Sequence, residues 1–113
     1  MSNSVETPQR TFLPRLFGDT VQVRIIEILL NNTLKEQQSE EILWENFSEI
    51  AKQAGVAKSS GKRILDQLIS SGFLEEKKYE THAQNPPRLI RLRSDQAVIR
   101  ELLFFFKKVR GFL

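Results

Sequence analysis

The sequence predicts a mainly helical α+β fold in which several helices precede a β-hairpin and one more helix follows it. Three observations lead to this prediction. Apolar residues recur at helical spacing in segments before residue 72. Residues 73–93 contain two candidate strands around a polar, proline-containing tip, and residues 94–113 return to a helical period. A chain of 113 residues is long enough for one small domain with a single core.

The first long helix is expected to follow an N-terminal arm of residues 1–18. Asp19 or Thr20 can cap its start, and the pair Asn31–Asn32 is expected to end it. Its apolar side has the spacing of a helix face, with Val21, Ile25, Ile28 and Leu29.

A polar connection follows, and then a short strand and a second helix are predicted. The apolar and aromatic run from Ile42 to Glu45 favours a strand. Asn46 is an N-cap residue for the helix over residues 47–54, which stops at Gly55. The turn after it is short, so the next helix must lie close by.

A third helix is predicted over about residues 57–71, with Gly72 as the glycine that follows its end. One face is apolar and includes Gly61, where a small residue lets two helix backbones approach. The opposite face is polar and consists of Ser59, Arg63, Asp66, Gln67 and Ser70, with Lys58 and Lys62 beside it.

The segment GVAKSSGKR has some features of a phosphate-binding loop. Such a loop needs four residues between its glycines, a Ser or Thr after the lysine, and a buried strand before it. Five residues separate Gly55 from Gly61, and Arg63 stands where the hydroxyl is needed. The segment before it also has helical periodicity, so the pattern argues against a nucleotide hydrolase.

Two helices joined by a tight turn that contains glycine form a helix-turn-helix unit. In this unit the second helix enters the major groove of DNA, where Arg and Lys suit guanine and Gln suits adenine. The expected DNA contacts from this helix are Lys58, Ser59, Ser60, Lys62, Arg63 and Gln67. The alternative is an ordinary helical hairpin with a solvated basic face.

The two candidate strands, residues 73–81 and 88–93, flank the tip HAQNPP. On the second strand Ile90 and Leu92 share one face, and arginines share the other. A helix-turn-helix followed by such a hairpin is a winged helix, so we expect a winged-helix domain over residues 19–93, with a three-helix core. Its basic hairpin residues would meet phosphates or the minor groove rather than read bases: Lys77, Lys78, Arg88 and Arg91, with His82 near the tip. Each of these could instead be a solvated strand charge.

Charge is unevenly distributed along the chain, whose net charge is +3. Residues 35–50 carry five glutamates and one lysine, whereas residues 51–93 carry nine basic and four acidic residues. A basic segment of this kind favours a polyanionic partner. A solvated surface of mixed charge explains the counts equally well.

The segments LFGDTVQVRIIEILLNN and FSEIAKQAGVAKSSGKRILDQLISSGFLEEKK resemble the small winged-helix transcriptional regulators that are common in archaea. The resemblance covers about residues 16–93. It implies sequence-specific binding to double-stranded DNA, usually as a homodimer on a two-fold site. Two positions depart from the family pattern, since Ala57 stands where serine is favoured and Gly61 replaces a larger apolar residue.

Residues 94–113 predict a C-terminal helix that is capped by Ser94 or Asp95 and runs to about Arg110. It is apolar on more than one side and must therefore be covered on more than one side. We expect it to be the dimerisation element, with the segment FLPRLF as its complement; the expected interface is Phe12, Leu16, Leu102, Phe105, Phe106 and Val109. In the simpler alternative it packs on the first helix and closes the core.

Other function classes have less support. Without cysteine there is no thiolate site, and the lone His82 has no catalytic or metal-ligand partner at a telling spacing, so we expect no enzyme activity, metal or cofactor. No apolar run approaches membrane length and the N-terminus has no apolar signal core, so a cytoplasmic protein is expected. The alternative function is a winged-helix adaptor in transcription or chromosome machinery that binds proteins without reading a DNA sequence.

Overall fold

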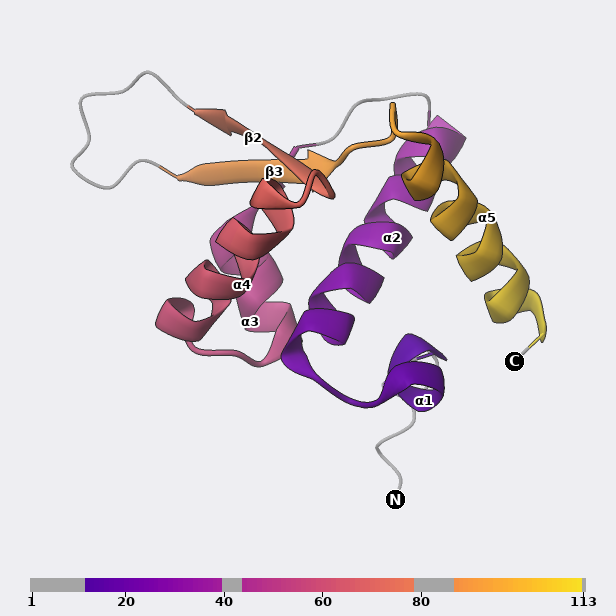
Figure 1. Cartoon of the computed structure of the whole chain (residues 1–113), viewed down its shortest axis with the longest axis horizontal. Coiled ribbons are helices and arrows are strands. Elements are labelled where there is room, and N and C mark those ends of the chain that lie inside the picture. The colour runs from indigo at the N-terminus through magenta and orange to yellow at the C-terminus, as the bar shows by residue number, and fades with distance from the viewer. Residues whose placement is uncertain (1–11, 40–43, 79–86, 113) are drawn as a thin grey trace.

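The structure of the chain is a computed structural model that describes residues 12–39, 44–78 and 87–112. Its elements, in chain order, are α1 (Phe12–Phe17), α2 (Val21–Ser39), β1 (Glu45–Asn46), α3 (Phe47–Ala54), α4 (Lys58–Ser70), β2 (Leu74–Lys78), β3 (Arg88–Leu92) and α5 (Ala97–Phe112). The predicted mainly helical α+β class is confirmed. Helices α3 and α4 and the β2–β3 hairpin lie on one side of α2, and α1 and α5 lie on the other (Figure 1).

The three strands form one antiparallel sheet in the order β1-β3-β2. Within the hairpin, Leu74 pairs with Leu92 and Lys78 pairs with Arg88. Leu74, Ile90 and Leu92 are buried, so the apolar side of the second strand is as predicted. The short strand predicted from Ile42 to Glu45 is Glu45–Asn46 instead, and residues 42 and 43 lie outside the described part of the chain.

The prediction that the first long helix ends at Asn31–Asn32 is wrong, because α2 continues to Ser39. Interactions with distant parts of the chain and within the helix stabilise the extra turns. Leu34 is buried in the core, the Thr33 hydroxyl donates to the carbonyl of Leu29 at 2.8 Å, and Glu36 accepts from Arg91 of β3 at 3.0 Å. At its start, the Thr20 hydroxyl accepts from the backbone N–H of Val23 and is the cap.

Helices α3 and α4 have the predicted ends and the predicted close approach. The side-chain oxygen of Asn46 accepts from the N–H groups of Ser48 and Glu49 at 2.8 and 3.4 Å. Gly55 has a φ of 69°, which favours glycine at this turn. Gly61 is buried on the inner face of α4, and a Cβ atom there would lie 3.0 Å from Cζ of Phe47.

The segment expected as an N-terminal arm contains α1, which belongs to the core. Leu13 is 3% exposed, and the carboxylate of buried Glu27 in α2 accepts from the N–H groups of Phe12 and Leu13, both at 2.8 Å. These are the first amides of α1, which a helix leaves without internal partners. Burial raises the pKa of Glu27 from its ordinary value of 4.5, and the two backbone hydrogen bonds oppose this shift.

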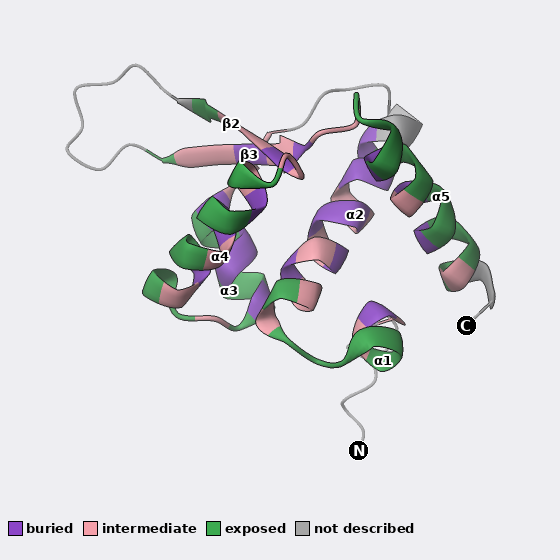
Figure 2. Ribbon diagram, viewed as in Figure 1, coloured by how far each residue is buried: buried purple, intermediate pink, exposed green. Residues whose placement is uncertain are grey.

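Helix α5 also packs into the same core, since Ile99, Leu103 and Phe106 are all buried. It begins at Ala97, so Gln96 precedes it at the cap position and not the predicted Ser94 or Asp95. Asp95 instead accepts two hydrogen bonds from the Arg93 guanidinium. The buried residues of all elements cluster around α2 (Figure 2), so the described chain has one continuous core. No described helix has both the length and the apolar content needed to cross a membrane.

Substitution of Gly61 tests the close approach of α3 and α4. Gly61→Val is expected to lower the free energy of unfolding by about 1–3 kcal/mol, because the added methyl groups must displace the buried ring of Phe47. Urea denaturation measures the change. Lys62→Val is the control, since it places the same side chain at an exposed neighbouring position of α4. Equal effects of the two substitutions would contradict the packing constraint.

Glu27 predicts a specific pH dependence of stability. Its folded-state pKa is raised, so at pH values between 4.5 and the raised pKa the folded state holds more protons than the unfolded state. Its contribution to the free energy of unfolding therefore falls as pH rises through this window. Glu27→Gln does not titrate, and the stability difference should shift in favour of the variant over this range. Denaturation at several pH values measures it, and parallel pH profiles would contradict the raised pKa.

Candidate nucleic-acid interface

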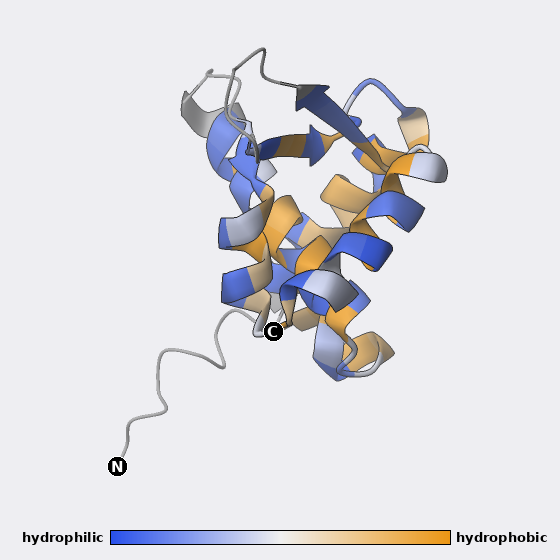
Figure 3. Cartoon of the chain, turned by 90° about the vertical axis from the view of Figure 1, so that its left-hand side faces the viewer, coloured by the Kyte–Doolittle hydropathy of each residue, from blue (hydrophilic) through white to orange (hydrophobic). Residues whose placement is uncertain are grey.

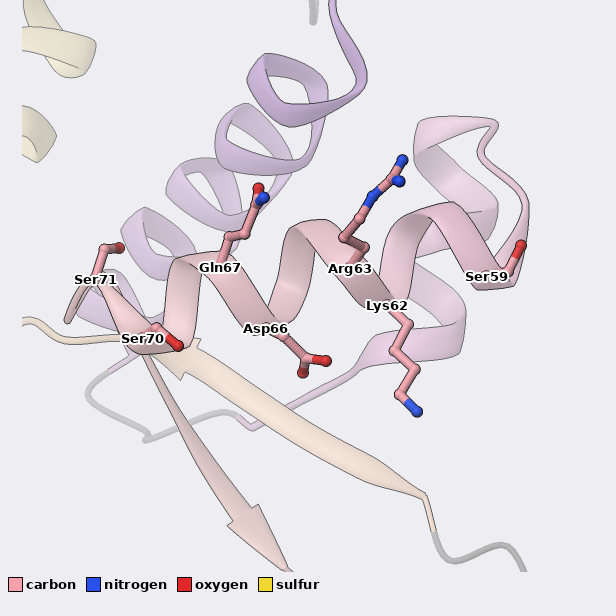
Figure 4. A pocket seen from close by; sticks show the side chains of 7 residues that line it. All are labelled: Ser59, Lys62, Arg63, Asp66, Gln67, Ser70 and Ser71. Atoms are coloured by element: carbon pink, nitrogen blue, oxygen red, sulfur yellow. The ribbon is translucent and has the colours of Figure 1, made fainter.

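The exposed face of α4 is polar and borders a shallow open groove. The groove is lined by Ser59, Lys62, Arg63, Asp66, Gln67, Ser70 and Ser71. Arg63 and Gln67 project together on one flank, and Lys62 and Asp66 project on the flank that faces the hairpin (Figure 4). In Figure 3, which views this side, hydrophilic segments cover the outside of the helices and hydrophobic ones face inward.

Three of the predicted contact residues form a straight row on this face. Ser59, Arg63 and Gln67 follow at four-residue intervals, so they form one row that is about 12 Å long at 1.5 Å per residue. The predicted residues of α4 are exposed, except Ser60, which is half-buried. Within the described residues, neither Lys58, Lys62 nor Arg63 has an ion-pair partner in the chain. Their charges are therefore free to meet a ligand.

The start of α4 has unused backbone donors. Ala57 occupies the N-cap position, and no side chain there accepts a hydrogen bond from the first turn. The N–H of Gly61 donates to the carbonyl of Ala57 at 2.9 Å, so the regular helical bonds begin at that residue. The N–H groups before it carry the partial positive charge of a helix N-terminus, beside Lys58 and Lys62.

The hairpin arginines lie in a different environment from the α4 cations. Nε and Nη2 of Arg88 donate to Glu76 at 2.7 and 3.0 Å, and Nη2 also donates to Asp66 of α4 at 3.0 Å. These hydrogen bonds raise the pKa of the already basic guanidinium, with Glu76 as the largest cause. Arg88, predicted as a phosphate contact, is thus held by two carboxylates of its own chain.

Arg91 is held on the other side of the sheet. It donates to Glu36 at 3.0 Å, and its side chain is only 17% exposed. Its guanidinium lies 5.6 Å from the centre of the Trp44 ring, and the Lys77 ammonium lies 5.7 Å from the same ring. Arg91 therefore ties β3 to the end of α2. Lys77 is exposed, whereas the side chain of Lys78 and the whole of His82 lie outside the described residues.

Sequence reasoning omitted three groove residues from the predicted contact set. The spacing of Asp66 and Ser70 predicts their place on the outer face of α4 but not a role in binding. Ser71 lies at the C-terminal end of α4, and its hydroxyl donates to the carbonyl of Leu68 at 3.0 Å. No local sequence signal could have identified the pairing of Asp66 with Arg88, because the partners are 22 residues apart.

The second predicted contact surface, between α1 and α5, is only partly exposed. Phe106 is 0% exposed and packs edge-on against Phe12 at 6.4 Å between ring centres, so it belongs to the core rather than to an interface. Leu102 and Val109 are half-buried. Leu16 and Phe105 are exposed, and the neighbouring Phe17, which was not predicted, lies 6.4 Å from Phe105 between ring centres. We call Leu16, Phe17 and Phe105 the α1–α5 apolar patch.

Comparisons with known proteins assign no function to these surfaces. No protein-family model matches the chain, and no curated protein matches it. Within the described residues there is no cluster of three His, Cys, Asp or Glu side chains that could hold a metal ion.

Proposed function

We propose that this protein is a winged-helix DNA-binding protein that regulates transcription as a homodimer, with α4 in the major groove. The observation that carries this proposal is the exposed face of α4, where Lys58, Lys62 and Arg63 have no ion-pair partner among the described residues. Arginine, lysine and glutamine side chains in a row on one helix can read base edges. A major groove about 12 Å wide admits such a helix.

The arrangement of the remaining elements supports the winged-helix assignment. Helices α3 and α4 are joined by a turn at Gly55, and the antiparallel hairpin β2–β3 follows α4 directly. In this fold α4 is the recognition helix and the hairpin is the wing. With Arg88 and Arg91 in ion pairs, Lys77 is the described wing residue that remains available to a phosphate.

The proposed homodimer forms through the α1–α5 apolar patch. Leu16, Phe17 and Phe105 are 48%, 60% and 41% exposed, which is unusual for three neighbouring large apolar residues. A two-fold dimer brings the same patch of each copy together. Because the patch and α4 lie on opposite sides of α2 (Figure 1), both recognition helices remain accessible in the dimer.

A protein–protein adaptor is the second candidate. The observation that favours it is the internal pairing of Arg88 and Arg91, which leaves the wing with fewer cations than the sequence alone suggests. In that function the α1–α5 apolar patch would bind another protein of the transcription or chromosome machinery, and α4 would be a solvated surface.

DNA binding across a range of salt concentrations distinguishes the two. Fluorescence anisotropy with a labelled duplex of the gene's own upstream region should give salt-sensitive binding that exceeds binding to a scrambled duplex. Each phosphate contact contributes about −0.9 to the slope of log K against log salt. With Arg63 reading a base edge, phosphate contacts from Lys58, Lys62 and Lys77 predict a slope of about −3 per copy.

Arg63→Ala is expected to weaken binding by about 1–3 kcal/mol and to reduce the preference for the upstream region, because Arg63 projects from the centre of the α4 face. Lys107→Ala removes one charge from an exposed position of α5 and is the matched control. Equal binding to both duplexes would contradict sequence-specific regulation. No binding at low salt would contradict DNA binding and leave the adaptor function.

The homodimer has its own test. Phe105→Asp is expected to weaken self-association at least tenfold, because the interface would have to bury a carboxylate. Phe104→Asp is the control, since Phe104 is also exposed but projects about 100° further around α5. Sedimentation equilibrium measures both. A monomeric wild-type protein at tens of micromolar, or equal effects of the two variants, would contradict this interface.

A further inference from the structure

Arg88 connects three elements of the structure through one side chain. It lies at the first position of β3 and binds Glu76 of β2 with two hydrogen bonds and Asp66 of α4 with a third. Glu76 is opposite Ile90 in the register, so Arg88 and Glu76 are diagonal neighbours on one face of the hairpin. The Glu76 side chain is 15% exposed, and Arg88 is 29% exposed.

The position of this connection determines what it can do. Helix α4 is joined to β2 by the turn at Gly72, which fixes the root of the hairpin. Arg88 lies at the opposite end of the described hairpin strands, where Lys78 and Arg88 pair. Buried Leu74, Ile90 and Leu92 pack the hairpin on the core, and the Asp66–Arg88 pair adds an attachment to α4 at the end of the strands that is far from the Gly72 turn.

The charge at Arg88 argues against a direct phosphate contact. One guanidinium faces two carboxylates, so the three side chains together carry a formal charge of −1. A phosphate that approached Arg88 would meet Asp66, which is 52% exposed on the groove side of α4. Without Arg88, the carboxylates of Asp66 and Glu76 would lose their shared cation and repel each other.

We propose that Arg88 is a positioning residue of the DNA-binding surface: together with Asp66 and Glu76 it holds the hairpin at a fixed angle to α4. In this role Asp66 assists DNA binding although its own charge opposes it. The inference rests on the proposed function, and it deepens that function by separating residues that contact DNA, such as Lys62 and Arg63, from a residue that aligns the two contact elements.

The structural half of the proposal is tested without DNA. Amide hydrogen exchange of the hairpin is measured for the wild type, Arg88→Gln, Asp66→Asn and the double variant. Each single variant should speed exchange of hairpin amides by roughly threefold to tenfold, and the double variant should add little to the larger single effect, because the two residues share one interaction. Independent, additive effects would overturn the proposed connection whether or not the protein binds DNA.

The functional half uses the salt dependence of duplex binding. Arg88→Gln should weaken binding by roughly threefold to tenfold while the slope of log K against log salt stays unchanged, because no phosphate contact is lost. Lys62→Gln, the matched control, should reduce the slope by about 1. A slope reduced equally by Arg88→Gln would overturn the positioning role and make Arg88 a phosphate contact.

Asp66→Asn gives the sharpest contrast. If electrostatics alone acted, removal of a carboxylate from the DNA-facing side would strengthen binding. The positioning role predicts weaker binding, and Arg88→Gln should then have a smaller effect in the Asp66→Asn background than in the wild type. Tighter binding by Asp66→Asn, with an undiminished Arg88→Gln effect, would overturn the proposal. Absence of all duplex binding, with coupled hydrogen exchange intact, would contradict only the proposed DNA function.

Discussion

Helix α2 is covered by other elements on two opposite sides, and the rest of the structure depends on this constraint. Ile25, Leu29 and Leu30 are at most 1% exposed. Successive positions such as Leu29 and Leu30 point about 100° apart, so the buried surface of α2 is wide. Helix α3 and strand β3 contact α2 from one side, and α1 and α5 contact it from the other. The polar α4 face and the α1–α5 apolar patch are therefore directed away from each other, which lets one surface associate without obstructing the other.

Two kinds of cation follow from this architecture. Those on the outer face of α4 extend from a helix whose inner face alone is packed, so they meet only solvent. The two arginines of β3 lie on a strand between two others, Arg91 on the face opposite to buried Ile90 and Leu92 and Arg88 on the same face as these residues, at the start of the strand. Their side chains reach carboxylates of α2, β2 and α4 and tie the sheet to the helices. Arg88 and Arg91, which the sequence suggests as ligand contacts, thus form ion pairs within the fold. The net charge of a segment therefore does not tell how many of its cations are free to bind a ligand.

The difference between local signals and long-range contacts explains how much of the fold and of the candidate site could be predicted from the sequence. Local signals were sufficient for α3 and α4, because Asn46, Gly55 and Gly72 mark helix ends through their own backbone preferences. The extent of α2 could not be predicted, because Glu36 is anchored by Arg91, which is 55 residues away. Phe106 was assigned to an interface because a helical period identifies apolar faces but not what covers them. The polar row of α4 could be predicted because it follows from the helical spacing of nearby residues. The role of Arg88 could not, because its partner Asp66 is 22 residues away in the sequence.

The limited number of free cations also bears on how the proposed regulator would bind DNA. Within the described residues of α4 and the hairpin, the available cations are Lys58, Lys62, Arg63 and Lys77, which give a single protomer only a few phosphate contacts. Nonspecific affinity at physiological salt depends on such contacts. In a dimer on a two-fold DNA site, binding of the first copy makes binding of the second copy intramolecular. The overall affinity then rises although each copy makes the same contacts as before. For the proposed DNA-binding function, a surface with few available cations would therefore make the proposed dimer a requirement for tight binding. It also makes the angle between α4 and the hairpin consequential, because a few contacts must all be aligned in both copies at once.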